Sequence, residues 1–127
     1  MASTTEPRIY TYISDSATIA KGSAVKIGTD NKHVAIGAAN TDKCFGIAQN
    51  AITAIGQMVE VAEIGGGAKA KLGEGVSAGA YLVSHTDGTL VKANTAGDHV
   101  CAFAKEDGST SDLIAVEVVA FEAYNAE

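Results

Sequence analysis

Short stretches in which apolar and polar residues alternate recur along most of this chain. Met58, Glu60 and Ala62 fall on one face of such a stretch, and Val59 and Val61 fall on the other. This two-residue period is typical of a half-buried β-strand. Further stretches with strand character lie at residues 24–27, 33–36, 44–48, 80–83, 90–92, 100–104 and 113–121. Regularly spaced short strands predict an all-β fold, either a small barrel or a sandwich.

Each half of the chain contains one tight turn between its first two strands. Residues 29–32 read Thr-Asp-Asn-Lys, and residues 86–89 read Thr-Asp-Gly-Thr. Asp-Asn and Asp-Gly tolerate the positive φ that two-residue hairpin turns demand, so we expect a hairpin in each half. Residues 49–56 have room for one helical turn at most, because their β-branched residues disfavour a longer helix.

The two halves match one another when the sequence is shifted by 57 positions without a gap. Gly22 falls on Gly79, Cys44 falls on Cys101, and the Val-Glu-Val of residues 59–61 falls on that of residues 116–118. Coincidence in a sequence rich in Ala, Gly and Val is the alternative to an internal duplication, which we favour. The sequence then predicts one domain over residues 1–127, with two similar four-strand halves at residues 18–64 and 75–121.

The N-terminal residues 1–13 lie outside this predicted repeat and form a candidate arm. Residues 2–6 are expected to be disordered, whereas residues 8–13 are β-prone and apolar on both faces. A strand of this kind either adds to a sheet edge of another subunit or partner protein, or forms an edge strand of the protein's own sheet. The candidate contact residues of this segment are Arg8, Ile9, Tyr10, Thr11, Tyr12 and Ile13.

A glycine-rich stretch, residues 64–75, separates the two halves. A phosphate-binding loop needs Gly-x-x-x-x-Gly-Lys-Ser/Thr between a strand and a helix. The lysines of this stretch follow the glycines at another spacing. We therefore expect a connector, or a strand preceded by a flexible joint.

Composition and charge narrow the classes of function. The net charge is −6 and Arg8 is the only arginine, so the basic patch that neutralises phosphates in nucleic-acid binding is missing. No apolar run approaches the ~20 residues of a spanning helix, and the first residues lack a signal-peptide core. We expect the protein to be made in the cytoplasm. Aromatic residues make up only 6% of the chain, which does not suit a deep pocket for a small-molecule substrate.

Candidate catalytic and metal-binding residues do not form a convincing constellation. Ser84, His85 and Asp87 resemble a catalytic triad in type, but neighbouring residues of a strand point to opposite faces. A metal site needs clustered ligands, and the histidines are separated in the sequence. We expect no enzyme activity, no catalytic residues, no metal and no cofactor. The three histidines are His33, His85 and His99.

The two cysteines occupy equivalent positions in the two halves. Cys44 and Cys101 are expected to be reduced, small and buried, as free cysteines in cytoplasmic proteins usually are. If the halves meet across a pseudo-two-fold axis, the two thiols come close together. A disulfide between them is then the alternative.

Several short motifs resemble small tailed-bacteriophage head proteins of the capsid decoration, or head cement, family. They are residues 20–25 (Ala-Lys-Gly-Ser-Ala-Val), 46–48 (Gly-Ile-Ala), 78–83 (Ala-Gly-Ala-Tyr-Leu-Val), 87–88 (Asp-Gly) and 91–93 (Val-Lys-Ala). The family pattern repeats a G-x-x-V strand, a D-G hairpin and a G-I-A strand, and the resemblance covers residues 18–121. The chain departs from it at residues 30–31, which are Asp-Asn, and at residues 102–104, which are Ala-Phe-Ala.

The resemblance implies a β-rich fold, a homotrimer at a three-fold or quasi-three-fold position of the capsid, and an N-terminal arm that grips the shell. The expected function is therefore capsid decoration: binding of the outer head surface and stabilisation of the shell by bridging capsomers. The expected partner is the major capsid protein, with no nucleic acid, membrane or small-molecule substrate. The expected location is the virion, on the outer surface of the capsid.

Two other functions stay open at this point. A lipoyl- or biotinyl-type carrier also has a duplicated β half, and Lys32 lies near a hairpin tip. The motif that flanks a modified lysine in such carriers is missing. Another virion component, such as a head-fibre base or a tail accessory protein, fits the same sequence features.

Overall fold

A computed structural model of the chain describes residues 8–94 and 97–122. Strands dominate these residues, as the alternating pattern predicts, and the fold is all-β. The first half contains β1 (Ile9–Ser14), β2 (Ala24–Ile27), β3 (His33–Ile36), β4 (Cys44–Ala48) and β5 (Met58–Glu63). The second half contains β6 (Gly67–Lys71), β7 (Tyr81–Ser84), β8 (Leu90–Lys92), β9 (His99–Ala104) and β10 (Leu113–Glu122), with a short 3-10 turn η1 (Thr86–Gly88) before β8.

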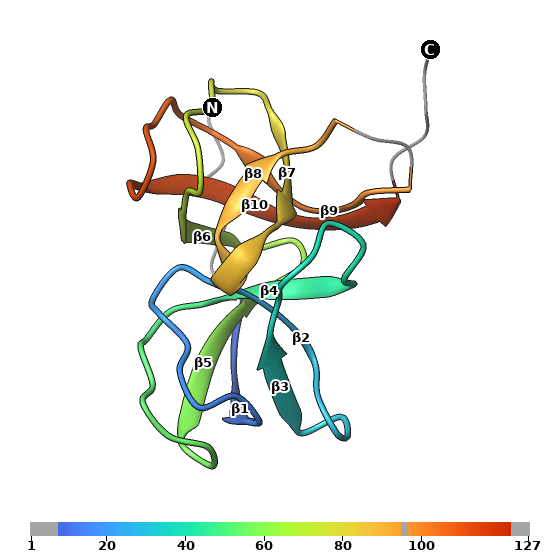
Figure 1. The fold of residues 1–127 in the computed structure, drawn as a ribbon, viewed down its shortest axis with the longest axis vertical. Helices are drawn as coiled ribbons and strands as arrows, with labels where there is room; N and C mark the ends of the chain where they lie inside the picture. The colour runs from blue at the N-terminus through green and yellow to red at the C-terminus, as the bar shows by residue number, and fades with distance from the viewer. Residues whose placement is uncertain (1–7, 95–96, 123–127) are drawn as a thin grey trace.

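The two halves have the same strand order. The first is a closed barrel with the order β1-β3-β2-β4-β5, and the second is a five-stranded sheet with the order β6-β10-β9-β7-β8. The two orders match when the second is followed around the sheet in the opposite direction, with β6 to β10 in the places of β1 to β5. The first barrel closes where β1 runs parallel to β3, at Ile13 and Ser14. In the second half a single parallel bridge, from Leu72 to Leu90, stands in the corresponding place. Figure 1 shows the two halves stacked, with β4 lying at their junction.

Each half has five strands rather than the four that the sequence predicts. Strand β1 pairs antiparallel with β5 from Ile9 opposite Ala62 to Ile13 opposite Met58. It is therefore a strand of the protein's own barrel, the second of the two interpretations of this segment, and not an extended arm. Its counterpart is β6, which pairs with β10 and forms from the glycine-rich stretch. The physical reason is that β5 and β10 need a partner for their second row of backbone groups.

Two clusters of buried side chains form the core. The smaller one fills the first barrel and consists of Ile19, Val25, Val34, Ala48, Ile52, Val59 and Val61. The larger one joins first-half residues such as Ala24, Cys44 and Ile47 to the interior of the second half. Val59 and Val61 face the barrel and Met58 and Glu60 are exposed, as the alternation predicts. Ala62 is buried because the outer face of β5 packs against the second half at this point.

The two hairpin turns differ in backbone conformation. Asp87 and Gly88 have φ values of 58° and 72°, as expected for a tight Asp-Gly turn. No described residue of the first turn has a positive φ. There the Asp30 carboxylate accepts a hydrogen bond from the Lys32 backbone N–H at 2.8 Å, which closes the turn in another way. Residues 49–56 form no helix, and Ile52 instead bridges to Ile19.

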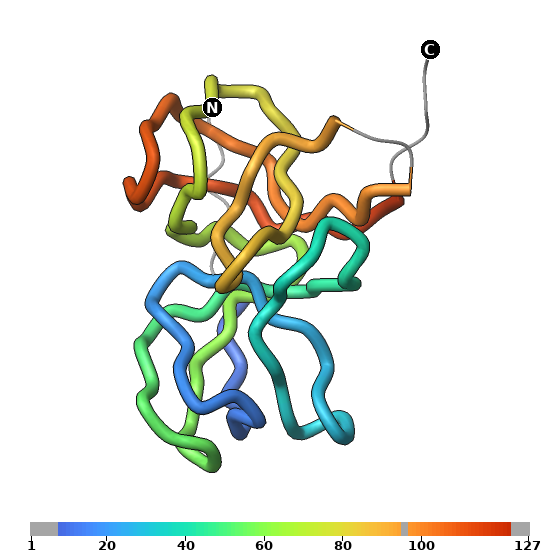
Figure 2. The backbone as a smooth tube through the Cα atoms, viewed as in Figure 1, coloured from blue at the N-terminus to red at the C-terminus, as the bar shows by residue number. Residues whose placement is uncertain are grey.

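Backbone hydrogen bonds and close approaches hold the halves together. The N–H of Lys71 donates to the carbonyl of Gly22 at 2.9 Å, and the N–H of His99 donates to the carbonyl of Asn40 at 2.8 Å. Gly37 fits directly against Ser84, since a Cβ on Gly37 would lie 2.3 Å from the Ser84 Oγ. The backbone tube in Figure 2 shows the path of the chain through the two stacked halves.

The position of β1 predicts how two truncations differ. Deletion of residues 1–13 removes a barrel strand, so cooperative unfolding of the first half should be lost. Deletion of residues 1–7 leaves every residue of β1 in place, so it should lower the free energy of unfolding much less than deletion of residues 1–13 does. Chemical denaturation followed by circular dichroism measures both. A fully folded 1–13 deletion would contradict the strand assignment.

Candidate interaction surfaces

The predicted contact segment is partly exposed as a barrel strand. Ile9 is 46% exposed and Tyr10 is 55% exposed, while Tyr12 and Ile13 are partly buried. The carbonyl of Arg8 accepts a hydrogen bond from the N–H of Glu63 at 2.8 Å. The segment therefore presents its first residues to solvent while its last residues close the barrel.

Tyr12 fixes this strand against the rest of the first half. Its ring meets Phe45 edge-on with the centroids 5.5 Å apart. Its hydroxyl donates a hydrogen bond to the Glu63 carboxylate. Burial, followed by this hydrogen bond and the nearby negative charge, raises the pKa of Tyr12 to about 12. The hydroxyl thus stays protonated and serves as a structural anchor.

A shallow hollow of about 450 Å³ lies between β1 and the β2–β3 turn. The exposed side chain of Met58, 62% accessible, forms part of its wall. A recessed apolar surface of this kind is suited to binding a protein segment. The residues that line it are Tyr10, Thr11, Tyr12, Ile13, Asn31, Lys32 and Met58.

A second apolar surface lies on the second half, and the sequence does not predict it. The ring of Tyr81 packs against Phe103 in a tilted arrangement, with the centroids 5.3 Å apart, and meets Phe121 edge-on at 5.2 Å. Tyr81 is 47% exposed and Phe121 is 42% exposed. We call these three residues the aromatic cluster. Strand pairing brings them together from β7, β9 and β10, and no local sequence pattern signals that pairing.

The residues that resemble a triad do not converge. Ser84 is buried, whereas His85 and Asp87 are exposed. The Ser84 Oγ makes no hydrogen bond to any described residue. Within residues 8–94 and 97–122, no group of three His, Cys, Asp or Glu side chains is placed to hold a metal ion. In the same residues no helix is long enough to cross a membrane.

Both cysteines are free thiols buried in the core that joins the halves. Burial raises the pKa of Cys44 to about 11. Burial, with a smaller contribution from nearby Cys44, raises the pKa of Cys101 further. The structure confirms that both residues are buried and describes them as free thiols, and their reduced state stays a prediction.

Lys32, the residue that a carrier would modify, is exposed beside the β2–β3 turn. Its backbone N–H holds the turn through Asp30. The carrier function stays a prediction, which the intact mass of the isolated protein tests.

The fold defines a class of small all-β proteins in which one five-stranded half follows another. Among solved structures, the chain is similar to the N base of head fiber gp8.5 from bacteriophage phi29, with a TM-score of 0.69 and 16% sequence identity. The match covers 93% of this chain and 98% of that chain. It therefore extends over both halves, and at this identity it shows the fold. No protein-family model and no curated protein matches the sequence.

The burial of the thiols predicts slow reaction with Ellman's reagent. At about pH 8, native Cys44 and Cys101 should react far more slowly than an exposed cysteine, because burial keeps them protonated. The variant Ile55→Cys supplies that exposed reference, since Ile55 is 68% accessible. Denaturant without reductant should release both native thiols. A denatured protein without free thiols would show that they form a disulfide.

The first turn predicts a measurable shift in a histidine titration. The Nδ1 of His33 lies 2.7 Å from the Asp30 carboxylate, and this hydrogen bond raises the pKa of His33 and lowers the pKa of Asp30. The pair therefore supports the turn at pH values between the two pKa values and loses strength on either side. In NMR titrations, Asp30→Asn should lower the pKa of His33. His99, whose pKa is lowered mainly by burial, is the internal control and should not change. An unchanged His33 would contradict the pair.

Proposed function

We propose that this chain is a structural component of a phage virion and stands on the outer surface of the head as the base of a head fibre. The observation that supports this most is the likeness to the head fiber base of phi29 over nearly the full length of both chains. This likeness favours the head-fibre-base alternative over a dedicated decoration protein. The two functions share one requirement, which is a stable attachment to the capsid.

The proposed mechanism is attachment through many weak contacts. The chain assembles as a homotrimer at a three-fold or quasi-three-fold position, and each copy contacts the major capsid protein. Contacts that share one rigid body act together, because the first contact raises the effective concentration for the others. This arrangement holds a fibre on the head without covalent chemistry.

The surface that we assign to capsid contact is the exposed start of β1 with the hollow beside it. Ile9 and Tyr10 are large apolar side chains about half exposed to solvent. Tyr10 lines the hollow and Ile9 precedes it on the strand, and apolar side chains gathered at a recess mark interaction sites more often than scattered ones do. Thr11, Tyr12 and Ile13 contribute to the wall of the hollow and also hold the strand in the barrel, and Arg8 holds it through its backbone carbonyl.

Purified protein incubated with fibreless heads of its own phage tests the proposal. We expect density at symmetry-related head positions in cryo-electron microscopy. The double variant Ile9→Ser/Tyr10→Ser should lower occupancy by tenfold or more, since contact residues that contribute about 1.4 kcal/mol change affinity tenfold. Ile55→Ser is the control, because it removes an exposed apolar side chain of the same kind as Ile9 from a position outside β1.

The possible outcomes test the proposed function and the assignment of the contact residues separately. Heads that stay bare with wild-type protein would overturn the proposed function. Heads that the double variant occupies like wild type would overturn only the assignment of contact to β1.

A further inference from the structure

The junction between the halves contains a docking contact on β2 of the first half. A Cβ on Gly22 would lie 2.8 Å from the Lys71 backbone N, so the end of β6 rests directly on this glycine. The Ser23 hydroxyl donates to the Asp87 carbonyl at 3.4 Å. Ala24, the next residue, is fully buried. Residues 22–24 are therefore covered by the second half.

The β7–β8 turn is the element that inserts at this contact. A Cβ on Gly88 would lie 2.8 Å from the Ser23 Cβ and 2.9 Å from the Ile36 Cγ1. Thr18 and Ala20 of the first half and Lys71 and Asp87 of the second line one small hollow beside this contact. The β7–β8 turn of the second half thus packs against the start of β2 in the first half.

The duplication repeats this docking face in the second half, where it is open. Gly79 corresponds to Gly22, and their φ values of 94° and 90° show the same backbone conformation. A Cβ on Gly79 would nevertheless meet nothing within 4 Å. Tyr81 is 47% exposed at the position that Ala24 occupies fully buried. The same surface is covered in one half and free in the other.

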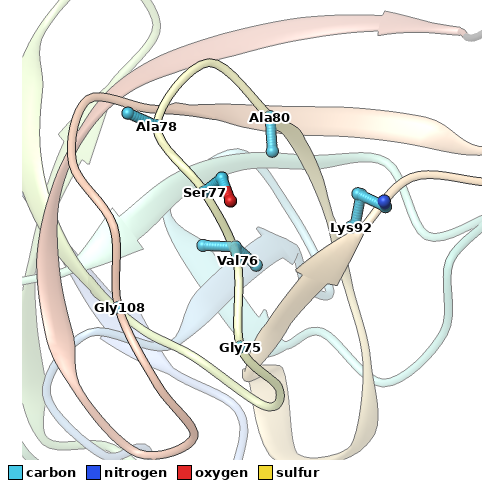
Figure 3. A pocket seen from close by; sticks show the side chains of 7 residues that line it. All are labelled: Gly75, Val76, Ser77, Ala78, Ala80, Lys92 and Gly108. Atoms are coloured by element: carbon cyan, nitrogen blue, oxygen red, sulfur yellow. The ribbon is translucent and has the colours of Figure 1, made fainter.

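A hollow of about 460 Å³ marks the open face (Figure 3). A shift of 57 positions relates Gly75, Ser77 and Ala80 in its wall to Thr18, Ala20 and Ser23 at the covered face. The aromatic cluster begins at Tyr81, directly after the hollow. The residues that line the hollow are Gly75, Val76, Ser77, Ala78, Ala80, Lys92 and Gly108.

The halves therefore pack head to tail rather than across a two-fold axis. A two-fold axis would bury Tyr81 and Phe103 in the same way as Ala24 and Ile47, which are paired in the equivalent register. Tyr81 and Phe103 are instead exposed and partly exposed. A head-to-tail contact leaves one face of the last unit free, and repetition of the contact produces a ring or a filament.

We propose that this hollow accepts the β2–β3 turn of a second copy of the chain. That turn, residues 29–32, is the counterpart of the β7–β8 turn and is exposed along its whole length. Its Asp30 carboxylate complements Lys92, the one charged residue among those that line the hollow. The contact between chains thereby repeats the contact within the chain, and this inference goes beyond the proposed function.

Engineered cysteines test the geometry of this contact. Ala78→Cys chains mixed with Asn31→Cys chains should give a disulfide-linked dimer on oxidation, because the two positions meet across the proposed contact. Ala78→Cys chains mixed with Ile55→Cys chains are the matched control and should give none. The native thiols are buried and do not compete. Cross-linking of Ala78→Cys chains only to one another would show a two-fold contact and overturn the inference.

Sedimentation analysis tests the association without a cross-link. The wild-type chain should form a defined multiple of 12.9 kDa at about 100 μM, since specific interfaces bind at micromolar Kd or tighter. Ser77→Trp, which fills the hollow from an exposed position, should weaken association at least tenfold with an unchanged thermal midpoint. A wild-type monomer at that concentration would overturn the inference. Binding of such a monomer to capsids would leave the proposed capsid attachment standing without the homotrimer in solution. Cross-linked rings that do not bind capsids would overturn the proposed function alone.

Discussion

The close approach of the two halves depends on side chains too small to keep them apart. β4 carries this constraint, because Cys44 and Ile47 face the second half while Ala48 faces the first barrel. Gly37 and Gly88 lie so close to the opposite half that an added Cβ would come within 3 Å of its atoms. Since protein interiors are packed as densely as crystals, a larger residue here would separate the halves. The position of every strand in the second half relative to the first follows from this contact.

Alternation of apolar and polar residues is enough to predict most strands of this fold. The strands that begin at Ala24, His33 and Cys44 match the sequence-based bounds, because each is a short β-prone run that ends at turn residues. The relation between β1 and β6 is different. The Ile-Tyr-Thr-Tyr-Ile-Ser of β1 and the Gly-Ala-Lys-Ala-Lys of β6 share no residue in register, although both complete the same sheet position. Pairing with β5 and β10, and not local propensity, determines that position.

The candidate surfaces are predictable from the sequence only in part. The β-prone, apolar character of residues 8–13 identifies β1 as a surface of interest, and Ile9 and Tyr10 are exposed. The exposure of the aromatic cluster and of the hollow beside it depends on whether the halves pack head to tail or across a two-fold axis. A repeat in the sequence does not show which of the two arrangements the halves adopt, since Ala24 and Tyr81 are at equivalent positions in both. The two thiols show the same point. Cys44 and Cys101 share one core cluster but are not equivalent, because Cys44 is paired with Lys26 whereas Val100, and not Cys101, is paired with Val83.

The difference between the two docking faces has a physical explanation in the connection between the halves. Within the chain, the short link through Gly65 and Gly66 holds the halves at a high effective concentration, so small residues such as Ala24 are sufficient at the internal junction. A contact between separate chains has no such link and needs more buried area from each side chain. Aromatic residues supply that area with little loss of side-chain freedom. Tyr81 and its neighbours Phe103 and Phe121 lie on the open face of the second half, which is not linked covalently to a partner. The larger side chains of the second half are thus explained by a partner that arrives from solution.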